Sequence, residues 1–279
     1  MVQMVKSNGF LEIEPPYREY EQAKFVILPV PHEKTTTYGK GTKHGPSAIL
    51  AASQQIETFD EELLQETYKK AGHYVTRSLS LNSLPTAVGK TIDAGKIPVI
   101  LGGEHSITPV VVGAVVKKFK NLSVLQLDAH ADLRDSYQGF KDSHACAMRR
   151  TLAYCPVVQT GIRNIAEEEY VYAKKSGQIK KIHFAANPSL VNKIISQLSA
   201  EVYITIDVDV FDPSLVPGTG TPEPGGLFWY QALDILRSVC AKKKIVGFDV
   251  VELAPIKGLP ASDFTAAKLV YRLMGYLAR

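Results

Sequence analysis

The chain alternates short apolar runs rich in β-branched residues with longer segments of helical pattern, and this alternation limits the folds open to it. Helices are predicted from Gly45, after Thr108-Pro109, over Trp229–Cys240 and over Asp263–Leu277. The apolar runs predict strands buried on both faces: Phe25–Val30, Ile97–Leu101, Ser123–Leu127, Val157–Thr160, Lys181–Phe184, Val202–Ile206 and Ile245–Val251. Strands that alternate with helices form a mostly parallel sheet with helices on both faces, so we expect a three-layer α/β fold.

The composition and the lack of a linker segment favour one globular domain. The 279 residues are 45% hydrophobic and 22% charged, which excludes a disordered chain, a collagen-like repeat and a coiled coil. Since no Pro/Gly/Ser-rich linker divides the chain, we expect a single domain over residues 1–279, with residues 1–24 as an N-terminal extension.

Charge and cysteine content exclude several classes of function. The net charge of +4 is small and scattered, so we expect no nucleic-acid partner. Three widely spaced cysteines form neither a disulfide framework nor a thiolate zinc site. No apolar run approaches the roughly 20 residues of a membrane span, and acidic residues interrupt the N-terminus where a signal peptide needs an apolar core. We therefore expect a soluble, cytoplasmic protein with no membrane partner.

Polar residues follow four of the predicted strands directly. They are Gly102-Gly103-Glu104-His105 after the second run, Asp128, His130 and Asp132 after the third, Asp207 and Asp209 after the sixth, and Glu252 after the last. Ligands of open α/β sheets bind outside the carboxyl ends of the strands. The sequence therefore predicts that these side chains meet at one edge of the sheet.

The residue types in this set indicate a metal centre. In extended backbone Asp128, His130 and Asp132 share one face, unless the chain turns before Asp132, and Asp207 and Asp209 repeat the spacing. Four ionised carboxylates repel one another in a small pocket, and two divalent cations balance their charge. A ligand set of oxygen and imidazole without sulfur suits manganese better than zinc. This chemistry predicts a two-metal hydrolytic site in which a bridging hydroxide is the nucleophile.

Each motif taken singly has a purely structural alternative. D-x-H-x-D can make turns at a strand end, Asp-Pro at 212–213 favours a turn, and His105 can be a hydrogen-bonded structural histidine. Glu252 can be a solvated acid at the end of a strand. The metal interpretation is favoured because all four motifs fall independently at strand ends.

The same motifs resemble those of the ureohydrolases, the family of arginase, agmatinase and their relatives. They are LGGEHS (101–106), DAHAD (128–132), IDVDVFDPSLVPGTGTPEPGG (206–226) and GFDVVELAP (247–255). The resemblance runs from about Phe25 to the C-terminal helix. It implies a single α/β domain around an eight-stranded, mostly parallel sheet, two Mn²⁺ ions per subunit, and a homo-oligomer, either a trimer or a hexamer.

The resemblance also implies a role for each residue of the site. His105, Asp128, Asp132 and Asp207 would bind one ion, and Asp128, His130, Asp207 and Asp209 the other, with Asp128 and Asp207 bridging. Glu252 would grip the substrate guanidinium, and His144 would shuttle a proton to the leaving amine. His144, Glu252 and Asp132 are the implied catalytic residues.

The segment Leu133–Gly139 bears on the substrate. Together with Ser143-His144 and Met148-Arg149-Arg150 it resembles agmatinases rather than arginases, which favours hydrolysis of agmatine to putrescine and urea. We expect Asp135 to meet the terminal amine and Tyr137 to line the methylene channel. Arg134 leaves open a carboxylate-bearing substrate, arginine or 4-guanidinobutanoate.

Two other classes of function stay open at this stage. A different two-metal hydrolase, such as a phosphatase, needs basic residues beside the metals, and Arg163 is the only obvious candidate at a strand end. A non-catalytic relative would have lost a metal ligand or Glu252, and none is lost.

Overall fold

The structure, a computed structural model, describes residues 9–185 and 187–278; residues 1–8 of the expected N-terminal extension lie outside the described part. Its main sheet has eight strands, and every strand pairing in it is parallel. The spatial order is β4-β1-β5-β10-β9-β6-β7-β8. The strands are β1 (Phe25–Pro29), β4 (His73–Val75), β5 (Ile97–Leu101), β6 (Leu122–Leu127), β7 (Val157–Ile162), β8 (Ile182–Phe184), β9 (Glu201–Asp207) and β10 (Lys244–Val251).

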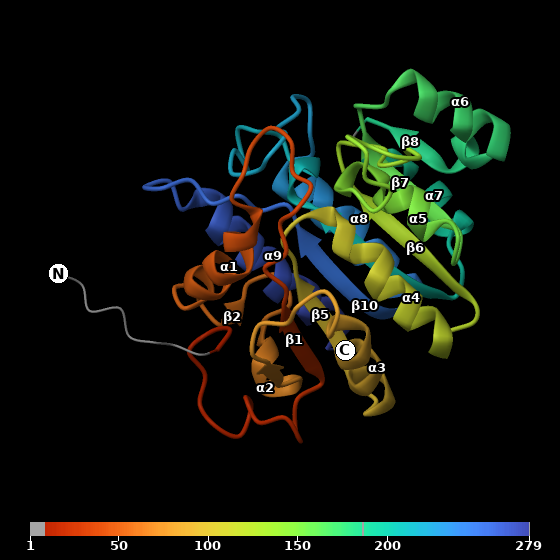
Figure 1. Ribbon diagram of the computed structural model, residues 1–279. Helices are drawn as coiled ribbons and strands as arrows, with labels where there is room; N and C mark the ends of the chain where they lie inside the picture. The colour runs from red at the N-terminus through yellow and green to blue at the C-terminus, as the bar shows by residue number, and fades with distance from the viewer. Residues whose placement is uncertain (1–8, 186, 279) are drawn as a thin grey trace.

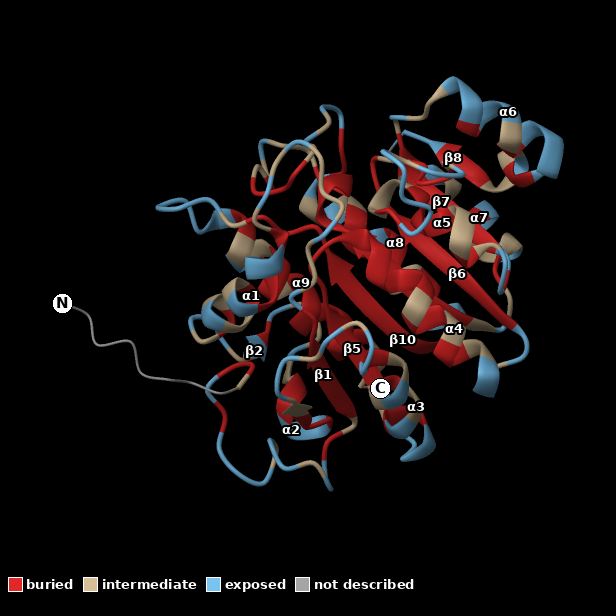
Figure 2. Cartoon of the chain, in the orientation of Figure 1, coloured by how far each residue is buried: buried red, intermediate tan, exposed pale blue. Residues whose placement is uncertain are grey.

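Helices cover both faces of this sheet, and a hydrophobic cluster fills the space on each side (Figure 1). The first face carries α1 (Gly45–Ser53), α2 (Thr67–Lys70), α7 (Val191–Gln197), α8 (Trp229–Lys242) and α9 (Ala261–Leu277). The second carries α3 (Leu84–Asp93), α4 (Thr108–Lys118), α5 (Ala147–Thr151) and α6 (Glu167–Ser176). Figure 2 shows the central strands buried throughout and the solvent-exposed residues on helices and loops. The expected three-layer α/β fold is confirmed.

The seven predicted strands and four predicted helices are all present, with ends shifted by a few residues. Sequence reasoning missed β4, which has only three residues, and the two-residue strands β2 (Phe59–Asp60) and β3 (Gln65–Glu66), which pair with each other. It also missed α3, whose segment LPTAVGKTID mixes Pro, Gly and β-branched residues. Such short or mixed segments lack a clear period of two or 3.6 residues.

The described part of the N-terminal extension packs on the body of its own chain. Phe10 and Leu11 are buried in the first hydrophobic cluster. The Leu11 amide donates to Ser53 Oγ at 2.9 Å, and His73 Nε2 lies 2.5 Å from the Phe10 carbonyl oxygen. This segment therefore covers the carboxyl-terminal end of α1 and the edge strand β4.

The strand order brings together the four strands that precede the polar motifs. β5, β10, β9 and β6 are consecutive in the sheet, although β9 and β10 come last in the chain. Since all four are parallel, their carboxyl ends lie on one edge, and the loops that follow them gather there (Figure 1). The predicted convergence of the motifs follows from this order.

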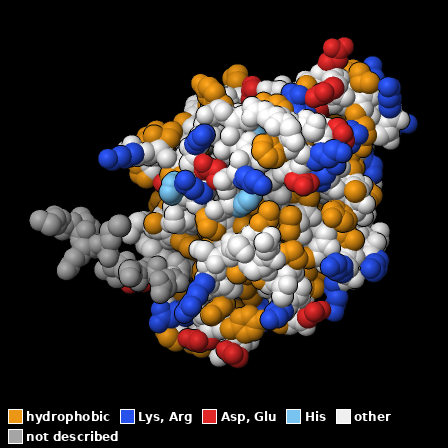
Figure 3. Space-filling view, viewed as in Figure 1, with side chains coloured by type: hydrophobic (Ala, Val, Ile, Leu, Met, Phe, Trp, Pro, Cys, Tyr) orange, Lys and Arg blue, Asp and Glu red, His pale blue; other side chains and the backbone are white. Residues whose placement is uncertain are grey.

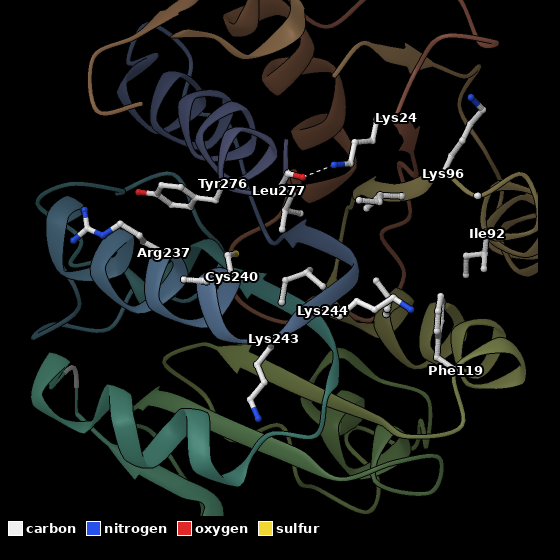
Figure 4. A pocket seen from close by; sticks show the side chains of 15 residues that line it. Lys24, Ile92, Lys96, Phe119, Arg237, Cys240, Lys243, Lys244, Tyr276 and Leu277 are labelled. Atoms are coloured by element: carbon white, nitrogen blue, oxygen red, sulfur yellow. Dashed lines mark hydrogen bonds between the residues drawn. The ribbon is translucent and has the colours of Figure 1, made fainter. Parts of the chain in front are cut away.

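The opposite edge of the sheet holds a cavity of about 630 Å³ with a different chemistry (Figure 4). Its described lining includes five cationic side chains and no carboxylate: Lys24, Lys96, Arg237, Lys243 and Lys244. Lys24 Nζ donates to the Leu277 carbonyl at 2.6 Å, and Lys243 Nζ to the Leu198 carbonyl at 2.6 Å. A cationic lining repels metal ions and guanidinium groups, so the chemistry expected from the sequence belongs to the carboxyl edge.

The surface carries charges of both signs. On the face shown in Figure 3, basic and acidic side chains are interspersed with small apolar areas. Among the described residues, no helix combines the length and hydropathy that a membrane crossing requires.

A buried ion-pair cluster fixes α9 against the β2 segment. Arg272 is 1% exposed; its Nε lies 2.6 Å from Asp60 Oδ2, and its Nη2 and Nη1 donate to Glu61 at 2.6 Å and Glu62 at 2.5 Å. Asp60 is equally buried. Removal of the guanidinium would leave its carboxylate without a charge partner, which costs far more than loss of an exposed pair.

We predict that Arg272→Met lowers the free energy of unfolding by about 3–5 kcal/mol, because the buried Asp60 loses its cation. Urea denaturation followed by circular dichroism measures the change. The matched control is Lys268→Met, since Lys268 Nζ lies 3.4 Å from the largely exposed Glu61, and an exposed pair contributes about 1 kcal/mol or less. Equal effects of the two substitutions would contradict the buried-cluster account.

Candidate active site

The residues expected to bind metal lie together at the tips of three of the four central strands, β5, β9 and β6. His105 begins the 3₁₀ turn after β5, Asp128, His130 and Asp132 follow β6, and Asp207 ends β9. Asp209 lies in the next 3₁₀ turn, Val208–Val210. Ligand atoms within 4.8 Å of one another form two groups, His105–Asp128–Asp132 and Asp128–His130–Asp209. Asp128 belongs to both groups, as a bridging ligand would.

Short distances join the two groups. His105 Nδ1 lies 3.1 Å from Asp128 Oδ2, 3.0 Å from Asp132 Oδ2 and 3.6 Å from Asp207 Oδ2. His130 Nδ1 lies 2.8 Å from Asp209 Oδ2. The six side chains therefore present two imidazoles and four carboxylates to one small volume.

Two acids of the site have left-handed backbone conformations. Asp132 has φ of 52° and Glu252 has φ of 63°, values that are uncommon for residues other than glycine. The turn at Asp132 departs from the extended backbone of D-A-H-A-D and brings its carboxylate to His105. Strained conformations of this kind persist where the surrounding structure holds them, and they cluster at functional sites.

Gly103 allows the chain to turn tightly between β5 and His105. A Cβ at this position would lie 1.9 Å from the His32 carbonyl oxygen. The same carbonyl accepts a hydrogen bond from the Glu104 amide at 2.9 Å. Only glycine permits this approach, which sets the start of the His105 turn.

Hydrogen bonds from neighbouring groups orient the ligands. Gln126 Nε2 donates to Asp128 Oδ2 at 2.6 Å, and the Ala129 amide donates to Asp209 Oδ1 at 3.0 Å. His105 Nε2 lies 2.9 Å from Thr205 Oγ1, which donates to Asp249 Oδ1 at 2.5 Å. An outer layer that fixes imidazole and carboxylate orientation is typical of metal sites.

Burial and mutual repulsion disturb the ionisation of these groups. Burial, followed by the charges of Asp209 and Asp132, raises the pKa of Asp128 to about 7. The pKa of Asp207 is also raised by burial and by Asp209. Although burial opposes it, the charge of Asp209 raises the pKa of His130 to about 11. The site therefore holds more negative charge than the protein alone stabilises.

A pair of divalent cations fits this arrangement. His105 Nδ1 is buried and has no hydrogen-bond partner among the described residues, although three carboxylate oxygens lie within 3.6 Å. A cation between the imidazole and these oxygens would satisfy the nitrogen. Imidazole and carboxylate donors without thiolate are a ligand set for manganese and related divalent ions.

Glu252 lies beside this cluster at the end of β10. Its Oε1 accepts a hydrogen bond from the His105 amide at 2.6 Å, and its side chain is 7% exposed. Burial raises its pKa to about 8, and no lysine or arginine of the described residues pairs with its carboxylate. A guanidinium group would supply a positive charge and two parallel hydrogen bonds.

His144 is held by a network that sequence reasoning missed. Glu104 is fully buried and accepts bonds from Lys34 N and Thr35 N at 2.6 Å and from Thr35 Oγ1 at 2.9 Å. Since the Thr35 hydroxyl donates to Glu104, it accepts from His144 Nδ1 at 3.1 Å. Nδ1 of His144 therefore carries a proton, which leaves Nε2 as the nitrogen free to exchange one.

The cluster lines a cavity of about 210 Å³ that also contains His144 and Glu252. Tyr137 and Arg134 line it as well, and the Tyr137 ring packs edge-to-face on His144 at 6.0 Å between centroids. Thr37, from the loop that follows β1, also lines it.

Asp135 departs from the expected position at the substrate amine. It does not line this cavity, and its carboxylate accepts a hydrogen bond from Arg150 Nη2 at 3.0 Å on the surface. Arg149 Nη2 lies 3.7 Å from the same oxygen. The left-handed turn at Asp132 redirects the following residues, so alternation along an extended strand does not predict where Asp135 points.

Arg163 is not available as an anion-binding residue. Its guanidinium donates to the carbonyl oxygens of Pro224 at 3.0 Å, Asp209 at 2.7 Å and Glu223 at 2.8 Å. This arginine holds two loops together, which removes the basic residue that a phosphatase would need.

Several residues of the cavity have no counterpart in the sequence-based predictions, and two of them bond to each other. Glu223 and Asn164 line it, and Asn164 Nδ2 donates a hydrogen bond to Glu223 Oε1. Glu223 lies within the motif GTGTPEPGG, but it follows no strand directly, so the strand-end rule does not select it.

Comparisons with known proteins agree with this geometry. Residues 23–275 match the arginase family. An N(1)-aminopropylagmatine ureohydrolase of Synechocystis sp. is 40% identical over 96% of this chain and 93% of its own length. The agmatinase of Pyrococcus horikoshii is 35% identical over 96% of this chain and 97% of its own length.

Solved structures show the same fold. The agmatine ureohydrolase of Thermoplasma volcanium has a TM-score of 0.83 and 28% identity, covering 98% of this chain and 95% of its own. An arginase of Medicago truncatula has a TM-score of 0.75 and 28% identity over 92% and 88%. The chain therefore belongs to the arginase family and is a hydrolase of its agmatinase-like ureohydrolases.

Proposed function

We propose that this enzyme hydrolyses the guanidino group of agmatine to putrescine and urea with a pair of Mn²⁺ ions. The observation that carries the proposal is Glu252, a buried acid with no lysine or arginine partner in the described part of the chain, beside two metal-type clusters in one cavity. His105, Asp128, Asp132 and Asp207 would hold one ion, and Asp128, His130, Asp207 and Asp209 the other. When bound, such a pair lowers the pKa of water so that hydroxide forms near neutral pH.

The protein's own residues would bind and orient the substrate. Glu252 would accept two hydrogen bonds from the guanidinium and hold its plane against the metal cluster. Burial lowers the pKa of His144, and its Nδ1 bond to Thr35 leaves Nε2 as the nitrogen that would take up a proton from water and pass it to the departing amine. Tyr137 would cover the methylene chain. These roles use proximity and acid–base chemistry.

N(1)-aminopropylagmatine is the second candidate substrate. The relative with 40% identity and two Thermus thermophilus relatives with 37% identity carry that name. This compound has the same guanidino end and a longer amine tail. The cavity chemistry suits both compounds, because each pairs a guanidinium with a cationic amine.

Carboxylate-bearing substrates are disfavoured by the charges of the cavity. Three carboxylates outside the proposed metal ligands line it: Glu169, Glu223 and Glu252. Arg134, the one arginine among the described residues of the lining, is already paired, with its Nη1 2.5 Å from Glu168 Oε1. Arginine and 4-guanidinobutanoate would place a negative group among acids.

We predict that the Mn²⁺-loaded enzyme releases urea from agmatine or N(1)-aminopropylagmatine at least about 100-fold more efficiently than from arginine or 4-guanidinobutanoate, since unpaired like charges cost several kcal/mol. The measurement is kcat/KM for urea release from all four compounds. Equal efficiency with a carboxylate-bearing compound would refute the proposed substrate class.

We predict that metal binding releases protons. In the ion-free protein the raised pKa values of Asp128, about 7, and His130, about 11, keep protons on the site at neutral pH. Cations displace them, so the Kd for Mn²⁺ falls as pH rises from about 6 to about 8. Calorimetric titration in two buffers of different ionisation enthalpy measures the release.

The control for this titration is Asp135→Asn. Arg150 lowers the pKa of Asp135, so this acid is already ionised at neutral pH and contributes no proton. The variant should match the unmodified enzyme. Metal affinity that is independent of pH would contradict the account of the site.

We predict that Glu252→Gln keeps both metal ions and loses about 10²-fold to 10³-fold in kcat/KM, because a neutral amide cannot pair with the guanidinium. Metal analysis and urea release are measured on the same sample. Loss of metal from the variant would instead make Glu252 a ligand.

A further inference from the structure

Glu223 is an acid of the active-site cavity to which neither the motifs nor the proposed chemistry gives a role. It lies in the loop after β9, and its side chain is 30% exposed, whereas Glu252 is 7% exposed. The two acids thus lie at different depths of one cavity, Glu252 inside and Glu223 toward solvent. A substrate with a cation at each end would meet one acid with each end.

The other acids of the cavity already have partners. Asp132, Asp207 and Asp209 belong to the metal cluster. Glu169 accepts from the Leu133 amide at 2.7 Å and the Ala166 amide at 2.8 Å, which makes it a cap for α6. Among the acids of the cavity, this leaves Glu252 and Glu223 to bind cationic groups of a substrate.

Glu223 has no lysine or arginine partner among the described residues. Its carboxylate accepts a hydrogen bond from the neutral Asn164 amide, and His130 Nε2 lies 3.8 Å away. A histidine that binds a metal is neutral and does not cancel this charge. Arg163 is adjacent, but its guanidinium bonds to the Glu223 backbone carbonyl instead of the side chain.

The backbone of this loop is held in place. Arg163 donates to the carbonyls of Glu223 at 2.8 Å and Pro224 at 3.0 Å, and Asp212 Oδ2 accepts from the Gly225 amide at 2.9 Å. Pro222 and Pro224 flank Glu223 and restrict φ on both sides. The carboxylate is therefore preorganised, which lowers the entropic cost of binding a cation.

We infer that Glu223 is a specificity-determining residue that binds the ammonium end of the substrate amine, with Asn164 orienting its carboxylate. The inference rests on the proposed function and extends it to the recognition of the tail. The preferred substrates are then guanidino compounds whose other end is a primary or secondary ammonium. With Glu223 in this role, the contact with the ammonium does not require Asp135, which pairs with Arg150 on the surface.

The test compares agmatine with 1-butylguanidine, which has the same guanidino end and four carbons but no amine. In Glu223→Gln, KM for agmatine should rise about 10-fold to 100-fold, since a charge-assisted hydrogen bond is lost. The kcat for agmatine and both constants for 1-butylguanidine should stay within about twofold. Metal content should stay at two ions per chain, which separates tail recognition from damage to His130.

The matched control is Glu201→Gln, an acid at the start of β9 whose side chain is 22% exposed and paired with Lys244, away from the cavity. It should leave both substrates unaffected. An equal loss for agmatine and 1-butylguanidine in Glu223→Gln, or no loss for either, would overturn this inference alone. Failure of the unmodified enzyme to release urea from agmatine and from N(1)-aminopropylagmatine would overturn the proposed function, and this inference with it.

Discussion

Four buried carboxylates at adjacent strand tips repel one another, and the organisation of the active site follows from the need to hold them there. Burial makes the repulsion strong, as the raised pKa of Asp128, about 7, and the raised pKa of Asp207 show. Backbone amides and Gln126 offset part of it. Divalent cations would neutralise the negative charge that is left, and the buried His105 Nδ1, which has no hydrogen-bond partner among the described residues, would bind one of them. The fold thus provides a cluster of negative charge that binding of metal ions would stabilise.

The sheet supplies the rigidity that such crowding requires. β5, β10, β9 and β6 are buried on both faces and parallel, so their ends cannot separate without loss of packing in both hydrophobic clusters. Left-handed backbone at Asp132 and Glu252 is tolerated for the same reason. Behind the candidate metal ligands, Asp249 accepts hydrogen bonds from the hydroxyls of Thr205, Tyr203 and Thr108 in a buried network. Strain and charge are therefore supported by the core rather than by flexible loops.

The loops at the carboxyl edge of the sheet supply the residues that would contact the substrate. Thr35 and Thr37 come from the loop after β1, Tyr137 from the loop after β6, and Glu223 from the loop after β9. Each loop is tied down by a buried or multiply bonded side chain, Glu104 for the first and Arg163 for the last. Relatives named for agmatine and for its aminopropyl derivative are 35% and 40% identical to this chain. Differences of substrate within the family would lie in such loops, because loops carry binding residues and vary more than the elements they connect.

The sequence by itself determined the class of fold, seven of the eight strands of the main sheet, and the residues that follow four of them, because apolar periodicity and strand-end position are local properties of the chain. The resemblance of its motifs identified the family. Only the tertiary structure decided that β5, β10, β9 and β6 are neighbours, that Asp135 turns to Arg150, and that Glu223 faces the cavity. These outcomes depend on strand order and on positive φ at Asp132, which arise from packing between distant segments and leave no periodic trace in the sequence.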